Sequence, residues 1–204
     1  RDAYSSRFFL YGPLGLFLAL AVGVMIHWWF AAEAFSRRLD ALNGHDLIPG
    51  VTMRFASKTI SGFPFRLDAV FTRFEITGAA PHGGFSWTSD EFALHSLTYG
   101  RTQDIFEAAG NQVLSWVDGE GRSHRLAFLP ASLRASASAD ENGLSRFDLD
   151  VIGAGGKDTG GAAFTAGRAQ FHLRRDPDGE TLDLMLSADE VKDAGGIAPL
   201  FGDR

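Results

Sequence analysis

A run of 25 residues without a charged side chain, from Phe8 to Ala32, constrains the fold of this 204-residue chain more than any other feature. As an α-helix it would be about 37 Å long, enough to cross a hydrocarbon core of about 30 Å with some tilt. It is also longer than the roughly 7–15 apolar residues at the centre of a signal peptide. The sequence therefore predicts a retained transmembrane helix over residues 8–32, after a cytoplasmic N-terminal end at residues 1–7.

Aromatic residues mark both ends of this predicted span. Trp28 and Trp29 are typical of the aromatic belt at one membrane interface, and Tyr11 is typical of the belt at the other. Ala32 and Ala34 also form the small-x-small pattern of a cleavage site, so a cleaved signal peptide is the alternative interpretation.

The positive charges beside the span do not choose its orientation. Arg1 and Arg7 precede it, while Arg37 and Arg38 follow it. A single early anchor with a long C-terminal domain usually exports that domain. We therefore expect the C-terminal domain on the periplasmic side of a bacterial inner membrane.

Residues 33–44 are predicted to continue the anchor as a polar stalk helix. Phe35, Leu39 and Leu42 recur at helical spacing on one side, and Asn43-Gly44 then ends the pattern. These three apolar side chains form a candidate docking surface for a partner. An accessory or scaffold subunit of a larger membrane protein complex, docked through the anchor and the stalk, is thus the alternative function.

Residues 45–204 are predicted to form an antiparallel β domain. In Ser61–Phe71 ("SGFPFRLDAVF") the apolar residues from Phe65 onward occupy every second position, as on one face of a strand. The apolar parity changes near Thr72-Arg73, which predicts a bulge, and again near His95-Ser96.

Turn-forming residues divide the rest of the chain. Three hairpins are predicted at Asp118–Gly121, Asp140–Gly143 and Asp176–Gly179. Gln103–Ala109 ("QDIFEAA") is predicted to be a short helix, and the glycine-rich stretch Gly153–Gly161 a loop or a frayed edge.

Charge and cysteine content exclude several classes of protein. Removing Arg1, Asp2 and Arg7 from the 19 basic and 25 acidic residues leaves a net charge of about −7 beyond residue 32. Such a surface repels nucleic acid. The chain has no cysteine, so it has neither a disulfide framework nor a thiolate nucleophile.

No catalytic, cofactor or metal motif is present in the sequence. Gly153–Gly161 lacks the glycine and hydroxyl positions of a P-loop, and Ser86 in "GFSWT" lacks the second glycine of a nucleophile elbow. Asp148 and Asp150 share a strand face but are typical of a solvated surface. The remaining candidate ligands are isolated histidines, so we expect neither an enzyme nor a bound metal or cofactor; these are His45, His82, His95, His124 and His172.

Eighteen phenylalanines are the positive signal for function. An antiparallel sheet with one apolar face can bury it in a sandwich, close it into a barrel, or curve it into a groove that holds apolar ligand. An empty groove is costly, because burying each phenylalanine is worth roughly 1.5–3 kcal/mol. We therefore expect a curved sheet, either a half-barrel groove or a sandwich.

The anchor, the Ser-Gly-Phe-Pro-Phe-Arg segment at residues 61–66 and "FSWTSDEFALHSLTYG" (Phe85–Gly100) resemble an alphaproteobacterial family of unknown function, number 2125 in the domain-of-unknown-function series. More loosely, the chain resembles the AsmA/TamB-like envelope proteins. That resemblance implies a curved sheet that handles phospholipid or acyl chains. It also implies that the wall of the groove is formed by Phe63, Phe65, Leu67, Phe71, Phe85 and Trp87.

The two ends of the sequence predict an internal piece of a longer chain. The sequence starts at Arg1 rather than at a methionine, and it stops at Asp203-Arg204 after "AGGIAPLF" without a polar tail. We expect further strands beyond this point.

Overall fold

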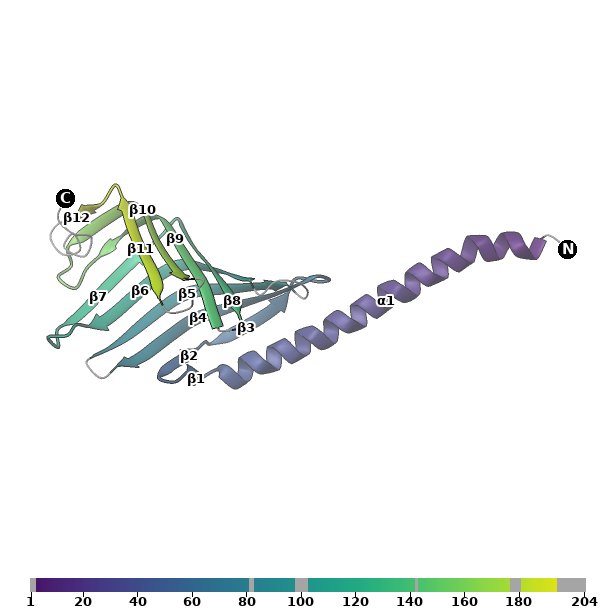
Figure 1. Cartoon of the computed structure of the whole chain (residues 1–204), viewed down its shortest axis with the longest axis horizontal. Coiled ribbons are helices and arrows are strands. Elements are labelled where there is room, and N and C mark those ends of the chain that lie inside the picture. The colour runs from purple at the N-terminus through teal and green to yellow at the C-terminus, as the bar shows by residue number, and fades with distance from the viewer. Residues whose placement is uncertain (1–2, 81–82, 98–102, 142, 177–180, 194–204) are drawn as a thin grey trace.

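The computed structural model describes residues 3–80, 83–97, 103–141, 143–176 and 181–193 (Figure 1). Within these residues one long helix is followed by twelve strands, so the predicted class, mainly β with an N-terminal helix, is confirmed. The helix is α1 (Ala3–Leu42), and the strands are β1 (His45–Ile48), β2 (Val51–Arg54), β3 (Ser57–Ser61), β4 (Arg66–Ala80), β5 (Gly83–Leu97), β6 (Gln103–Val117), β7 (Ser123–Leu129), β8 (Ser132–Asp140), β9 (Gly143–Lys157), β10 (Ala163–Arg175), β11 (Leu182–Asp189) and β12 (Lys192–Asp193).

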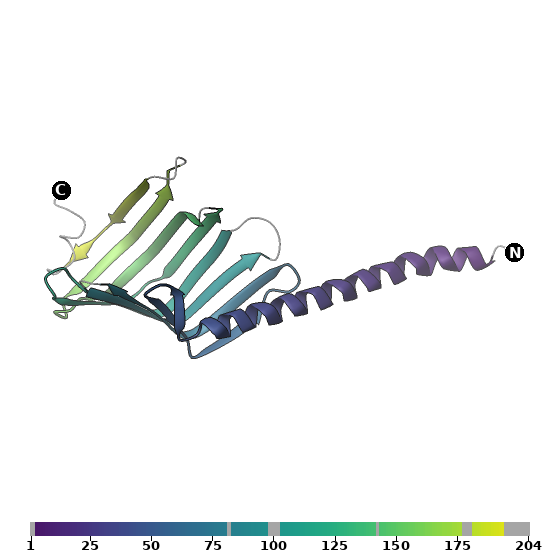
Figure 2. The ribbon, with the colours of Figure 1, turned by 60° about the horizontal axis from the view of Figure 1, so that its bottom comes forward.

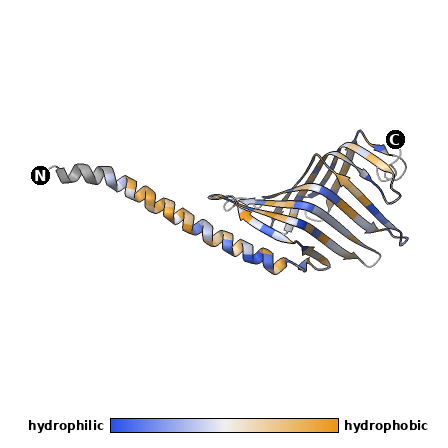
Figure 3. Ribbon diagram, turned by 180° about the vertical axis from the view of Figure 1, so that it is seen from behind, coloured by the Kyte–Doolittle hydropathy of each residue, from blue (hydrophilic) through white to orange (hydrophobic). Residues whose placement is uncertain are grey.

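Helix α1 is continuous and includes both the predicted span and the predicted stalk. From Tyr11 to Leu42 it is long and apolar enough to cross a membrane. Its middle is apolar, whereas its C-terminal turns are more polar (Figure 3). The helix ends where Asn43 N donates to Leu39 O at 3.1 Å and Gly44 takes a left-handed φ of 81°. A glycine in this conformation is typical of a helix C-terminus, which confirms the predicted stop.

All twelve described strands belong to one antiparallel sheet, whose main path is β1-β2-β4-β5-β6-β7-β9-β10-β11. β3 follows β2 along the same side of β4, β8 follows β7 between β6 and β9, and β12 lies beyond β11 along β10. The sheet twists and curls across its width (Figure 2). Within the described residues no second sheet faces it, so the sandwich alternative is not the fold observed.

Apart from β1, the strands end or pass through one common level, which we call the interruption row. On every second strand the row has a residue with a left-handed φ: Arg73 at 49° in β4, Gly110 at 76° in β6, Gly153 at 63° in β9 and Glu190 at 54° after β11. The strand register places each of these residues at the same level as a residue of the neighbouring strand, for example Arg73 beside Asp90 and Gly153 beside Gly167. The complete row is Ala56, Arg73, Asp90, Gly110, Ala131, Gly153, Gly167 and Glu190.

The interruption row explains why apolar residues change parity without leaving the core. Phe71 and Phe74 lie on either side of Arg73, are 1% and 2% exposed, and have ring centroids 5.6 Å apart. Strict alternation would place them on opposite faces. The left-handed residue between them returns Phe74 to the face of Phe71, so the apolar face continues through the row.

The main core lies between this face and the C-terminal turns of α1. Leu39 contacts a cluster that includes Met53, Ala69, Phe71 and Phe74. Lys58 of β3 also donates to Asp40 of α1. The rings of Phe74 and Phe92 add a stacked pair with centroids 4.2 Å apart.

Several local predictions are wrong in detail. The predicted bulge at Thr72-Arg73 is a left-handed residue in an unshifted register with β5, and the register shift lies instead at Asp90, where Gly110 and Asn111 of β6 face one residue of β5. No slip occurs at His95-Ser96 within the described part of β5.

Two segments predicted to lack strand structure are strands. Gln103–Ala109 forms the first half of β6 rather than a helix, because it lies between β5 and β8 and pairs with both. Gly153–Lys157 continues β9, and only the turn from Asp158 to Gly161 follows it.

The predicted hairpins agree with the observed pairing. Asp118–Gly121 connects β6 to β7, and β8 pairs with β9 up to Asp140 and Gly143. β10 pairs with β11 as expected, with Phe171 opposite Leu186 and Leu173 opposite Leu184. The turn residues 177–179 lie outside the described residues.

Candidate functional site

An apolar row runs across the whole width of the sheet between the interruption row and the end nearest α1. Directly opposite residues of an antiparallel sheet share a face, so the register identifies the members of this row. They are Ile60, Ala69, Leu94, Phe106, Ala135, Leu149, Phe171 and Leu186. We refer to the side of the sheet that carries this row as the apolar face.

A parallel apolar row lies next to the interruption row on the same face. It contains one cation, at its β3 end, and is otherwise apolar. Its members are Lys58, Phe71, Phe92, Ala108, Leu133, Val151, Ala169 and Ala188.

Beyond the interruption row the apolar face contains a buried polar residue, Gln112. Its Nε2 lies 2.9 Å from Ser89 Oγ and 3.2 Å from the carbonyl oxygens of Ala109 and Gly110, and its Oε1 accepts from Trp87 Nε1 at 3.1 Å. The side chain is 0% exposed. Gln112 thus satisfies the polar groups that the register shift at Asp90 leaves inside the core.

The apolar face is covered at one end of the sheet and open at the other. Under α1, Ala69 and Phe71 are 0% and 1% exposed. On β11, Leu184 and Leu186 are 65% and 55% exposed, although they occupy the same face. Within the described residues nothing covers this far end, so it is a continuous apolar surface of the kind that typically binds a ligand.

Four of the six predicted wall residues lie on the apolar face, and the other two lie off the sheet. Leu67 and Phe71 lie on the apolar face, but Phe71 is buried in the main core. Phe85 and Trp87 lie beyond the interruption row, where Trp87 bonds to Gln112. Phe63 and Phe65 are not on the sheet but in the connection between β3 and β4.

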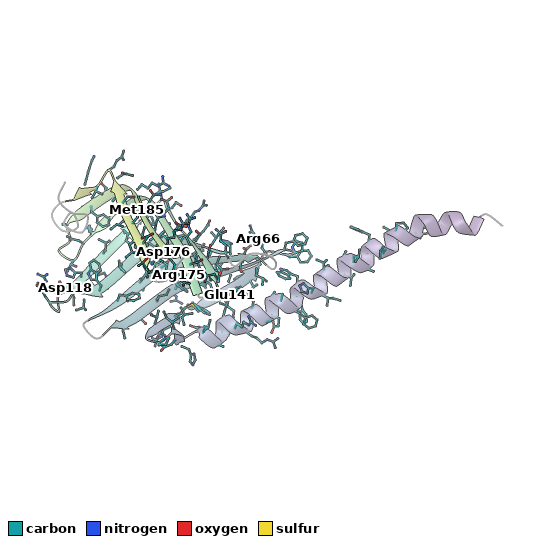
Figure 4. All side chains as sticks on the ribbon, in the orientation of Figure 1. Arg66, Asp118, Glu141, Arg175, Asp176 and Met185 are labelled. Carbon is teal, nitrogen blue, oxygen red and sulfur yellow. The ribbon has the colours of Figure 1, made fainter. Side chains whose placement is uncertain are left out.

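The connection between β3 and β4 lies against α1. Trp28 Nε1 donates to Arg66 O at 2.9 Å, and the rings of Trp28 and Phe63 meet edge to face with centroids 5.6 Å apart. Pro64 and Phe65 line a hollow of about 400 Å³ whose other wall is the helix segment Ala19–His27. Figure 4 shows Arg66 at the end of the sheet nearest α1 and Asp118 at the opposite end.

The predicted membrane-interface residues occupy different environments. Tyr11 and Trp29 are 62% and 59% exposed, as expected for side chains that face lipid. Trp28 is partly covered by its contacts with Phe63 and Arg66. Of these three residues, Trp28 is the one that also contacts the β domain.

The predicted docking residues contact the protein's own sheet. Leu39 is buried in the main core, and Phe35 and Leu42 pack against that core. The apolar side of this helix segment therefore packs against the protein's own sheet, while Phe35 and Leu42 remain partly exposed.

The opposite, polar face carries two similar charged triads that the sequence analysis missed. In the first, Asp68 accepts from Arg66 Nη2 and lies within hydrogen-bonding distance of His95 Nδ1, both at 2.7 Å. In the second, Arg146 Nε donates to Asp148 at 2.6 Å, and His172 Nδ1 lies 2.7 Å from the same carboxylate.

The two triads follow one rule of strand geometry. An Arg-x-Asp sequence puts both side chains on one face of a strand, and antiparallel register puts a histidine of the next strand opposite the aspartate. The pair of Arg-x-Asp sequences, at residues 66–68 and 146–148, was the signal available in the sequence.

Burial alone would raise the pKa of Asp68, but the hydrogen bonds from His95 and Arg66 outweigh it, so the pKa lies below its usual value. The same balance, with Arg146 and His172, lowers the pKa of Asp148. Both oxygens of each carboxylate are bonded, which suits a structural role. In the described residues no three metal-binding side chains come together.

Comparison with known proteins gives one match. The family model described as "Uncharacterized protein conserved in bacteria (DUF2125)" matches residues 28–201. No curated protein and no solved structure matches the chain.

Proposed function

Since the chain belongs to the DUF2125 family, whose description names no activity, we propose a function from its structure: a non-enzymatic, membrane-anchored protein that binds acyl chains of lipid on its apolar face. Helix α1 is the single-pass anchor in a bacterial inner membrane. The β domain lies on the periplasmic side, as expected when a long domain follows one early anchor.

The observation that carries this proposal is the open end of the apolar face. Leu182, Leu184 and Leu186 are each more than half exposed, although they extend a face that is closely packed under α1. Burying a leucine side chain is worth about 1.5–3 kcal/mol. Because about 60% of each side chain is still exposed, these three residues together offer about 3–5 kcal/mol to an apolar ligand that covers them.

The dimensions of the open end suit one lipid tail. Adjacent strands lie about 4.8 Å apart, so the three strands β9, β10 and β11, whose larger apolar-face side chains are half-buried or exposed, span about 10 Å between the outer pair. One leaflet of a hydrocarbon core of about 30 Å is about 15 Å thick, which is the reach of one tail. A tail laid across these strands thus contacts the sheet along about two thirds of its length.

Lipid is favoured as the occupant by the position of the domain. Helix α1 holds the sheet next to a bilayer, where acyl chains are the most concentrated apolar molecules. The polar face carries the charged triads and stays in water, which leaves the apolar face as the surface that can receive a tail.

The test compares two glutamate substitutions on strand β11. Leu184→Glu places a carboxylate on the apolar face, whereas Met185→Glu places it on the polar face of the same edge strand, at a residue that is 58% exposed. Desolvating an unpaired carboxylate costs several kcal/mol. We expect Leu184→Glu to lower the lipid bound by about tenfold or more, since about 1.4 kcal/mol suffices for that factor.

Bound lipid is measured by native mass spectrometry of the full chain purified in detergent, after exchange into lipid of known composition. Met185→Glu should retain the lipid of the unmodified protein. Equal retention by both variants, or no lipid on the unmodified protein, would refute the proposal.

A further inference from the structure

The connection between β3 and β4, Phe63-Pro64-Phe65, lies beside the apolar part of α1 rather than beside its polar C-terminal turns. Its contacts run from Trp28 back to Ala19. A helix rises about 1.5 Å per residue, so Leu20 lies about 12 Å along the axis from Trp28 toward the centre of the predicted span. We refer to residues 63–65 as the hairpin tip.

The helix face next to the hairpin tip has small side chains. Ala19 and Gly23 are one turn apart, so they lie on the same side of α1 and leave room for Pro64 and Phe65. If Trp28 marks the membrane interface, this side of the helix lies below the headgroups. The hairpin tip then reaches the acyl region of the same leaflet.

The chemistry of the hairpin tip suits that depth. Phe63 and Phe65 are 52% and 55% exposed, so much of each ring is available to surrounding lipid. The turn that presents them is held from within, because Arg66 N donates to Gly62 O at 2.9 Å and Gly62 has a left-handed φ of 101°.

The charged residue next to the tip is also placed for a membrane interface. The Arg66 side chain is 58% exposed and pairs with Asp68, whose side chain is 8% exposed. An arginine at this position can keep its guanidinium at headgroup level while the preceding rings enter the hydrocarbon.

We propose that the hairpin tip is a second membrane-inserted element, which enters the periplasmic leaflet beside α1 and holds the near end of the apolar face against the acyl chains. The proposal rests on the anchor role proposed for α1. Two points of insertion on one rigid body would fix the tilt of the sheet relative to the bilayer. The apolar face would then open toward the leaflet from which a tail is taken.

Because the chain has no cysteine, single cysteines can report depth without background. The variants are Phe65→Cys at the tip, Leu20→Cys in α1 as the membrane control, and Glu120→Cys in the turn between β6 and β7 as the aqueous control. The side chain of Glu120 is 73% exposed. Its backbone N donates to Asp118, which Figure 4 shows at the end of the sheet opposite α1.

Each full-length variant is labelled with an environment-sensitive fluorophore and reconstituted into phosphatidylglycerol/phosphatidylethanolamine vesicles with spin-labelled lipid. For Phe65→Cys we expect a blue-shifted emission and quenching close to that of Leu20→Cys, while Glu120→Cys stays unquenched. Far-UV circular dichroism verifies that each labelled variant keeps its sheet.

The outcomes separate this inference from the proposed function. If Leu20→Cys is quenched and Phe65→Cys behaves like Glu120→Cys, the tip inference is wrong and the anchor stands. If Leu20→Cys is not quenched, the anchor itself is refuted and the tip inference falls with it. A labelled Phe63→Cys variant repeats the measurement if Phe65→Cys does not fold.

Discussion

Replacing Gln112 by leucine should destabilise the sheet strongly, although leucine is apolar and of similar size. The Gln112 side chain is fully buried beside the register shift at Asp90. It accepts from the Trp87 indole and donates to Ser89 Oγ and to backbone carbonyls. Leucine satisfies none of these groups.

The expected cost follows from the bonds that are lost. Each net hydrogen bond is worth about 0.5–1.5 kcal/mol, and a buried donor left without an acceptor costs about 1–3 kcal/mol. With the Trp87 indole N–H unsatisfied and the bonds to Ser89 and Ala109 lost, the free energy of unfolding should fall by about 2–5 kcal/mol.

The assay is denaturant unfolding of the full chain in detergent, followed by far-UV circular dichroism. Gln103→Leu, at an exposed position of the same strand, is the matched control and should change stability by less than about 0.5 kcal/mol. In the Gln112→Leu background, Trp87→Phe should cost less than it does alone, because the indole has already lost its acceptor. A Gln112→Leu cost no larger than that of Gln103→Leu would refute this account of the polar cluster.

Three further changes test other parts of the fold. Asp68 and Asp148 have pKa values below the usual 3.8, so their contribution to stability is present above that pH and is lost as the pH falls below it. Unfolding midpoints of the double asparagine variant should therefore fall less between pH 6 and about pH 3 than those of the unmodified protein. Arg73→Gly should raise the unfolding free energy by about 0.5–1 kcal/mol, because φ of 49° strains any residue with a Cβ, and a fall in the denaturation midpoint would contradict this. Leu39→Asp should detach the C-terminal turns of α1 from the sheet and lower the free energy of unfolding by more than about 3 kcal/mol, whereas Arg38→Asp, at an exposed position, should change it little. Limited proteolysis after residue 42 measures the detachment. Equal protection of both variants would count against the packing described.

The helix and most strands could be predicted because their patterns are local. The uncharged run from Phe8 to Ala32 allows few alternatives, and alternation from Phe65 to Phe71 directly specifies one apolar strand face. The hairpin turns carry their own signals in glycine, aspartate and asparagine.

Segments with misleading composition could not be predicted this way. Gln103–Ala109 contains good helix formers, but this weak preference is overridden by pairing with β5 and β8, which places Phe106 and Ala108 on the apolar face. The glycines of β9 suggested a loop because their role is steric. At Gly156 a Cβ would collide with Ala127 O and Phe128 of the neighbouring strand.

An apolar face was predicted with four of its residues, but the part of that face that stays exposed was not. Alternation identified an apolar face, but nothing in the sequence shows which part of that face α1 covers. Phe71, a predicted wall residue, is therefore buried in the core, whereas the exposed Leu184 and Leu186 were not among the predicted site residues. The tip residues Phe63 and Phe65 gained their importance from contact with a helix segment about 40 residues earlier in the chain, which no local pattern reveals.

The interruption row has a consequence for how sequences of this family can vary. Because its eight positions lie in register on neighbouring strands, inserting one residue between a hairpin turn and the row would move that strand's kink out of line and rotate half of its side chains to the wrong face. Lengthening a turn leaves the alignment intact. Natural variants should therefore differ in length at the two ends of the strands while keeping a constant number of residues from each turn to the kink.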